Sequence, residues 1–164
     1  MKYLKRLFNI LSWPVYICIV AYLLISAPLL LGYKPVVVLS GSMEPAYHVG
    51  SILYYKSAPF DQIAEGDVIT FHTGENSLVT HRVAEKQEIS RAFVTKGDAN
   101  NTADPNPVSY DAVAGKALRF SIPYAGYFVT AGKKPIAIGI MAVILILGML
   151  LDNTGSEDTS KEKE

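Results

Sequence analysis

The chain has 164 residues, with 15 Lys and Arg against 15 Asp and Glu, and half of its residues are hydrophobic. The absence of net charge gives no reason to expect a nucleic acid or a polyanionic substrate. A single cysteine, Cys18, excludes an intramolecular disulfide, and three histidines with one cysteine lack the usual ligand spacing of a zinc site. We therefore expect no metal and no organic cofactor.

The first 34 residues combine a short basic segment with a long apolar stretch. Lys2, Lys5 and Arg6 precede residues 7–33, which carry no charge and are long enough to cross a bilayer as one helix. A secretory signal peptide has the same order of segments, but this stretch is longer, so we interpret it as a transmembrane helix. By the positive-inside rule, the N-terminus is cytoplasmic and the following residues emerge on the outer face of the cell membrane.

Residues 36–45, with the sequence VVVLSGSMEP, contain the candidate nucleophile. Four aliphatic residues indicate a buried strand, and the Ser-Gly-Ser that follows breaks it as a tight turn. Ser42 would then present its hydroxyl on rigid backbone, as an activated serine requires. The alternative is an ordinary turn that ends a strand.

From residue 35 to 132 the chain alternates short apolar runs with Gly, Pro, Asn and Asp, which is typical of an all-β domain. The expected strands are Ser51–Tyr55, Asp67–Phe71, Val79–Val83, Phe93–Thr95 and Val113–Phe120. Residues 65–67 would form a turn before one of them, and residues 122–126 a turn that returns the chain to the membrane. We expect this domain to lie outside the cytoplasm.

His81 and two carboxylates are the other candidate site residues. Period-two alternation places His81 on the apolar face of its strand, away from Arg82, where it is either a core histidine or a base. Asp98 and Asp104 lie in the sequence KGDANNTADPNP, which is either a solvated loop or the source of a carboxylate that orients His81. The residues alone leave both questions open.

The C-terminal part reads as a second, shorter span followed by a polar tail. Residues 136–151 form another uncharged run, marginal in length for crossing a bilayer, and we place a second transmembrane helix at 133–151. Lys133 and Lys134 would lie on the outer side, which the positive-inside rule disfavours. Residues 152–164 are polar and charged, and we expect them to be disordered.

Four ordered motifs together resemble the type I signal peptidases of the endoplasmic-reticulum type, which occur in archaea, in the eukaryotic signal peptidase complex and in some Gram-positive sporulating bacteria. The motifs are SGSMEP around Ser42, GDVITF at 66–71, THRV around His81 and KGDANNTAD at 96–104. The resemblance implies a mostly β, signal-peptidase-like catalytic domain flanked by two transmembrane helices. It also implies Ser42 as nucleophile, His81 as base and Asp104 as the acid that orients it, with Asp98 as a second acidic position.

The function implied by this resemblance is removal of signal peptides from secreted preproteins after small residues, in Ala-x-Ala-like sites, through an acyl-enzyme. The implied partners are preproteins, the lipid bilayer and the secretion translocon. Two other interpretations remain. A repressor-type self-cleaving protease would need a lysine base and a DNA-binding segment, which the sequence lacks. A non-catalytic, membrane-anchored β module would assist assembly of an extracellular structure.

Overall fold

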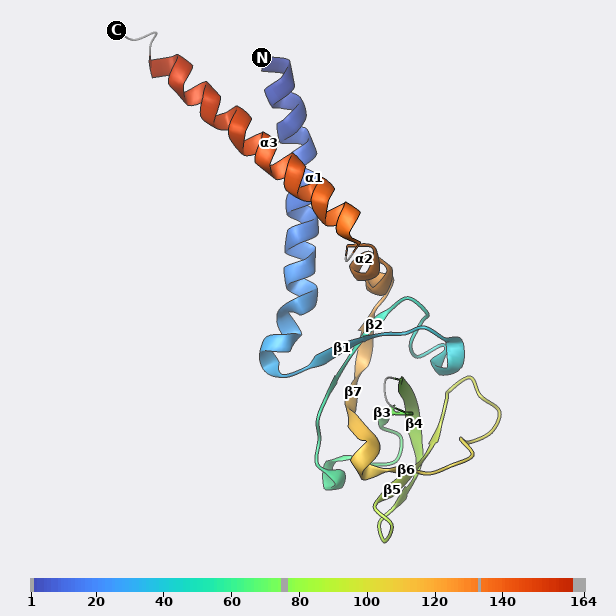
Figure 1. The fold of residues 1–164 in the computed structure, drawn as a ribbon. Coiled ribbons are helices and arrows are strands. Elements are labelled where there is room, and N and C mark those ends of the chain that lie inside the picture. The colour runs from blue at the N-terminus through green and yellow to red at the C-terminus, as the bar shows by residue number, and fades with distance from the viewer. Residues whose placement is uncertain (1, 75–76, 133, 161–164) are drawn as a thin grey trace. The chain divides into compact units, whose positions relative to one another are not determined.

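The computed structural model describes residues 2–74, 77–132 and 134–160, and the described chain forms two compact units. One unit contains residues 27–127 and holds all the strands (Figure 1). The other contains residues 1–26 together with 128–164, and it is helical where it is described.

The β unit is built on one antiparallel sheet of seven strands in the order β1-β2-β7-β3-β4-β5-β6. The strands are β1 Lys34–Val37, β2 Ile52–Lys56, β3 Val68–His72, β4 Leu78–Gln87, β5 Ala92–Lys96, β6 Val108–Ser109 and β7 Val113–Ile122. Short 3-10 helices occur at Ala27–Leu31, Gly41–Met43, Phe60–Gln62 and Tyr110–Ala112. The prediction of a mostly β domain is confirmed, and each expected strand is present. The strand expected to be buried at 36–39 is the exception in detail: it is β1, which ends at Val37 and is only half-buried there, because it lies at the edge of the sheet.

Two of these strands are longer than the sequence predicts. β4 and β7 have 10 residues each. β4 continues past its apolar core into polar residues that pair with β5, and β7 continues past Phe120 to Ser121 and Ile122, which pair with β2. The short strand β6 carries no clear apolar pattern and was not predicted.

The buried side chains of the β unit form two clusters. The first contains Phe60, Ile63, Ile69, Phe71, Val83, Phe93 and Val108. The second contains Met43, Tyr47, Leu53, Tyr55, Val68 and Ala117. Burial of one such side chain stabilises a fold by about 1.5–3 kcal/mol. Because Met43 and Tyr47 belong to the second cluster, the turn that carries Ser42 is fixed to the core on its C-terminal side.

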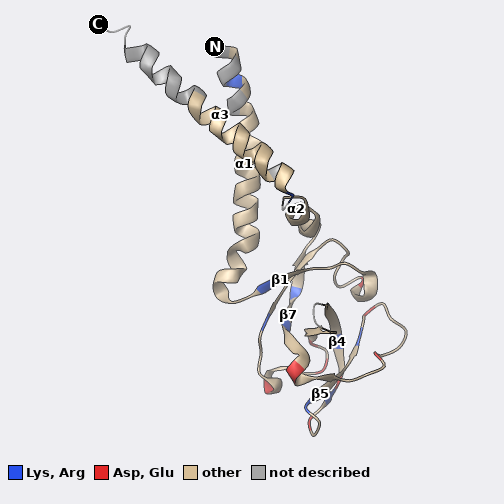
Figure 2. Ribbon diagram, viewed as in Figure 1, with Lys and Arg blue, Asp and Glu red and all other residues tan. Residues whose placement is uncertain are grey.

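The helical unit contains α1 Lys2–Ser26 and α3 Pro135–Ser160, and the short helix α2 Ala125–Gly132 leads into it from β7. An apolar stretch of 22 residues, Ile10–Leu31, begins in α1 and is long enough to cross a membrane. The corresponding apolar part of α3, Ile138–Leu150, is shorter than a span requires. Figure 2 shows both stretches without charged residues, whereas acidic and basic residues occur throughout the β unit.

Two predictions near the C-terminus differ from the structure. The chain forms α2 directly after the turn at residues 123–124, where a simple return to the membrane was expected. Helix α3 continues to Ser160, although the polar composition from Asp152 onward predicts disorder. Composition indicates which residues cannot form a core, but a helix already nucleated can extend into them. Lys133 and residues 161–164, on which predictions were also made, lie outside the described residues.

The expected turn at residues 65–67 is held by a carboxylate, which yields a test of stability. Asp67 Oδ2 accepts hydrogen bonds from Lys116 Nζ at 2.6 Å and from Ala64 N at 2.9 Å. Burial, the largest single influence, would raise the pKa of Asp67, but the bonds from Lys116 and Ala64 and the nearby cations together lower it. This stabilisation is therefore present above the carboxyl's unfolded pKa and is lost as the pH falls through the lower, folded value.

Asp67→Asn is accordingly expected to lower the free energy of unfolding at pH 7 by about 1 kcal/mol, a figure reduced because Lys116 is partly exposed. The difference from wild type should shrink on acidification, because the wild-type carboxylate is then protonated as well. Urea unfolding of both chains at neutral and acidic pH measures this. An equal difference at both pH values would show that the ion pair does not contribute to stability.

Candidate active site

Ser42 lies in the 3-10 turn Gly41–Met43 that follows β1. Its own side chain is half-buried, while Met43 and Tyr47 on its C-terminal side are almost fully buried. The Tyr47 hydroxyl donates to the carbonyl oxygen of Leu118 at 2.7 Å, which ties this turn to β7. The backbone of Ser42 is thus anchored and its hydroxyl is within reach of a substrate.

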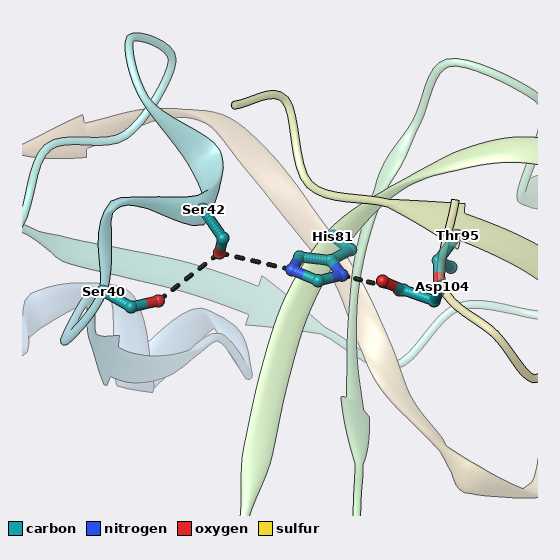
Figure 3. A network of polar contacts seen from close by, with 5 residues as sticks. All are labelled: Ser40, Ser42, His81, Thr95 and Asp104. Atoms are coloured by element: carbon teal, nitrogen blue, oxygen red, sulfur yellow. Dashed lines mark hydrogen bonds and ion pairs between the residues drawn. The ribbon is translucent and has the colours of Figure 1, made fainter. Parts of the chain in front are cut away.

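His81 connects Ser42 to a carboxylate (Figure 3). It lies on β4 opposite Ile69 of β3, and its side chain is only 10% exposed. Its Nε2 lies 3.2 Å from Ser42 Oγ, and its Nδ1 lies 2.6 Å from Asp104 Oδ2. Because a carboxylate only accepts hydrogen bonds, Nδ1 carries the proton and the lone pair of Nε2 faces Ser42. A base in this tautomer can take the proton of the hydroxyl.

The two candidate carboxylates serve different partners. Asp98 pairs with Arg82, through Nε to Oδ1 at 2.8 Å and Nη2 to Oδ2 at 2.6 Å. This hydrogen-bonded pair raises the pKa of Arg82. Arg82 Nη1 also donates to the carbonyl oxygen of Gly66 at 2.8 Å. Since His81 and Arg82 are neighbours on a strand, they point to opposite faces and separate the two aspartates. The structure brings Ser42, His81 and Asp104 together. Asp98 is instead bound to Arg82, at the start of the loop that carries Asp104.

That loop is also joined to the backbone of Ser42. The amide of Ala99 donates to the carbonyl oxygen of Ser42 at 2.9 Å. A Cβ added at Gly97 would lie 2.6 Å from the same oxygen, closer than real atoms approach. The close approach explains why the KGD sequence needs a glycine at this position.

The sequence did not predict that two further polar residues contact the site. Ser40 Oγ lies 3.4 Å from Ser42 Oγ. Thr95, the penultimate residue of β5, donates from Oγ1 to Asp104 Oδ2 at 2.6 Å. Ser40 lies two residues before Ser42, and Thr95 lies two residues before Gly97. This position next to a motif is the feature of the sequence that could have identified both residues.

A cavity of about 420 Å³ lies against Ser42 and His81. Its other lining residues come chiefly from β1 with its extension to Leu39 and from Leu78–Thr80 of β4. β1 is an edge strand, and β4 pairs with β5 only from Arg82 onward, so both have free edges beside the cavity. Among the residues that the structure describes, no group of three or more His, Cys, Asp or Glu is placed to hold a metal ion.

Comparison with known proteins gives two kinds of relative. The chain is 41% identical over 99 residues to signal peptidase I W of Bacillus subtilis, which covers 58% of this chain and 52% of the relative. It is 38% identical over 102 residues to the signal peptidase complex catalytic subunit SEC11C of Homo sapiens, which covers 56% of this chain and 53% of that protein. No family model matches the chain. The chain thus spans about half the length of these relatives, and the similarity confirms the resemblance that its motifs indicate, to the endoplasmic-reticulum type of type I signal peptidases.

Proposed function

We propose that the chain is a membrane-anchored serine endopeptidase that removes signal peptides from secreted preproteins after small residues. The observation that carries this proposal is the line of contacts from Ser42 Oγ through His81 to Asp104, with an apolar cavity beside the serine. Similarity to signal peptidases from a bacterium and from mammals supports the same class of reaction.

In this mechanism Ser42 Oγ attacks the carbonyl carbon of the scissile peptide bond while His81 Nε2 takes its proton. Asp104, 2.6 Å from Nδ1, stabilises the imidazolium that forms. The imidazolium then gives its proton to the leaving amine, and an ester links the signal peptide to Ser42. Water attacks this ester with His81 again as base, which frees Ser42. The backbone amide of Ser42 would contribute a hydrogen bond to the oxyanion.

The free strand edges suggest how a preprotein would bind. An extended peptide placed between the extension of β1 and residues Leu78–Thr80 can form main-chain hydrogen bonds with either edge. Alternate side chains would then point toward the cavity. A chamber of about 420 Å³ lined largely by aliphatic groups accepts small apolar side chains and gives no charged partner to a Lys or Glu. The proposed preference for Ala-x-Ala-like sites comes from the resemblance to signal peptidases, and an apolar cavity beside Ser42 is compatible with it.

The helices would anchor the chain in the membrane. Ile10–Leu31 would cross the bilayer, and the shorter apolar part of α3, Ile138–Leu150, would be a second span with flanking residues reaching the interface. The basic N-terminus would be cytoplasmic and the β unit outside. An enzyme and a substrate that are both held in one membrane meet at a raised effective concentration. Preproteins emerging from the secretion translocon would be the substrates.

The direct test is cleavage of a preprotein with an Ala-x-Ala site by the full chain in detergent, with the new N-terminus of the product sequenced. We expect one cut, after the second Ala of the site. A matched preprotein with Phe in place of that Ala should be cut at least about 100-fold more slowly, because the proposed activity requires a small side chain before the cleaved bond. An extract from cells that lack the chain controls for other proteases.

Equal cleavage of both preproteins would contradict the proposed selectivity for small residues. A folded chain that cuts neither would contradict the peptidase function and favour a non-catalytic membrane-anchored module.

A further inference from the structure

The carboxylate of Asp104 is held by Thr95 as well as by His81, and both donate to the same oxygen. His81 Nδ1 and Thr95 Oγ1 each lie 2.6 Å from Asp104 Oδ2 (Figure 3). We propose that Thr95 is a positioning residue, which fixes the carboxylate so that it stays aligned with His81 during catalysis. This inference rests on the proposed peptidase function.

Thr95 is built into the sheet in a way that suits this role. It lies in β5 directly opposite Val83 of β4, and its side chain is fully buried. A threonine has a stiff side chain because it is branched at Cβ. In the described structure, its hydroxyl donates to Asp104 Oδ2. A buried hydroxyl aimed at one carboxylate oxygen is a rigid donor that the loop itself could not provide.

Thr95 also fixes the main chain of Asp104. The Asp104 amide donates to the carbonyl oxygen of Thr95 at 2.8 Å. One residue of the sheet therefore holds both the backbone and the side chain of the aspartate, although the seven residues 97–103 form an irregular loop. The last torsion of an aspartate side chain is soft. Without the hydroxyl, the carboxylate, which is 21% exposed, would be free to turn toward water.

The position of Thr95 predicts which kinetic constant changes. Thr95 is not among the residues that line the cavity, so it should not contribute to substrate binding. Its effect passes through Asp104 to the imidazolium, which exists only after proton transfer has begun. Loss of the hydroxyl should therefore lower kcat and leave KM unchanged.

The central comparison uses Thr95→Val, which keeps the shape and removes the donor, and Thr95→Ser, which keeps the donor. We expect kcat to fall about 10-fold in the valine variant and to stay within about threefold of wild type in the serine variant. The matched control is Thr70→Val. Thr70 is an equally buried threonine of β3, and its hydroxyl bonds to Thr80 at 2.9 Å instead of to Asp104. We expect its kcat to stay near wild type.

A graded variant keeps the test decisive if Thr95→Val does not fold. Thr95→Cys has a weaker S–H donor of similar size, so its kcat should lie below that of Thr95→Ser. Equal kcat in the serine and cysteine variants, or in the valine variant and wild type, would overturn the proposal. So would a change confined to KM.

A second readout does not depend on cleavage. The proton on His81 Nδ1, bonded to a carboxylate at 2.6 Å, should give a low-field ¹H resonance in the full chain. We expect this signal to weaken or move upfield in Thr95→Val and to persist in Thr95→Ser. If the wild-type chain cuts no preprotein, the proposed function fails, and the resonance alone decides whether Thr95 positions Asp104. An unchanged signal in Thr95→Val would refute the inference.

Discussion

Replacing either Ser42 or His81 by alanine is expected to lower kcat for preprotein cleavage by about 10⁴-fold or more. Without Ser42 no oxygen attacks the scissile carbonyl. Without His81 the serine keeps its proton, because in the described part of the chain the other side chain in contact with Ser42 Oγ is the Ser40 hydroxyl, which is not a base. Steady-state kinetics with the full chain in detergent micelles measure the loss.

The double variant gives the sharper result. A nucleophile without a base and a base without a nucleophile are equally inactive, so Ser42→Ala combined with His81→Ala should cost little more than either change alone. Losses that multiply would contradict the view that the two side chains, 3.2 Å apart, act as one unit. The control is His72→Ala, the same substitution at an exposed histidine at the end of β3, which should leave kcat unchanged.

The same contact predicts the pH dependence of the wild type. Only neutral His81 can accept the Ser42 proton, so activity should fall as the solution becomes more acidic. A lysine base would instead require a more alkaline range. A kcat/KM profile without an acidic limb would argue against His81 as the base.

The strands and the direction of His81 could be predicted because both follow from alternation. His81 was placed with the apolar side of its strand and Arg82 on the opposite side, and in the structure His81 is buried while Arg82 reaches Asp98. Period-two geometry holds along a strand whatever the rest of the fold does. It therefore identified the face of the sheet on which the candidate site is built.

The residue pattern alone could not choose the partners of His81, because they depend on the path of a loop; the family resemblance was what pointed to Asp104. Residues 97–104 have no period, and both Asp98 and Asp104 were plausible acids. The choice is made by contacts between distant segments, such as the amide of Ala99 on the Ser42 carbonyl and the amide of Asp104 on the Thr95 carbonyl. Thr95 was unpredictable for the same reason. The sequence predicted that Thr95 lies in a strand. Its contact with Asp104 depends on how the loop at residues 97–103 folds back toward β5.

The Gly97→Ala variant tests how closely that loop must approach the backbone of Ser42. No positive φ is required at Gly97, so alanine should fit the backbone and the effect should be steric. The added Cβ would lie 2.6 Å from the Ser42 carbonyl oxygen and 2.8 Å from Asn100 Nδ2. The asparagine side chain can move, but the Ser42 carbonyl is backbone, and it also accepts the Ala99 amide.

Relief of the contact would therefore displace Ser42 relative to His81. A displacement of about 1 Å can cost about 100-fold in rate, so we expect kcat to fall by that order, with a loss of stability of about 1–3 kcal/mol. Kinetics and urea unfolding measure the two effects. Gly139→Ala in α3, where an added Cβ meets nothing within 4 Å, is the control and should leave kcat unchanged without any loss of stability. If Gly97→Ala kept full kcat while losing stability, the loop would yield without moving Ser42, and the link between loop and nucleophile would be structural alone.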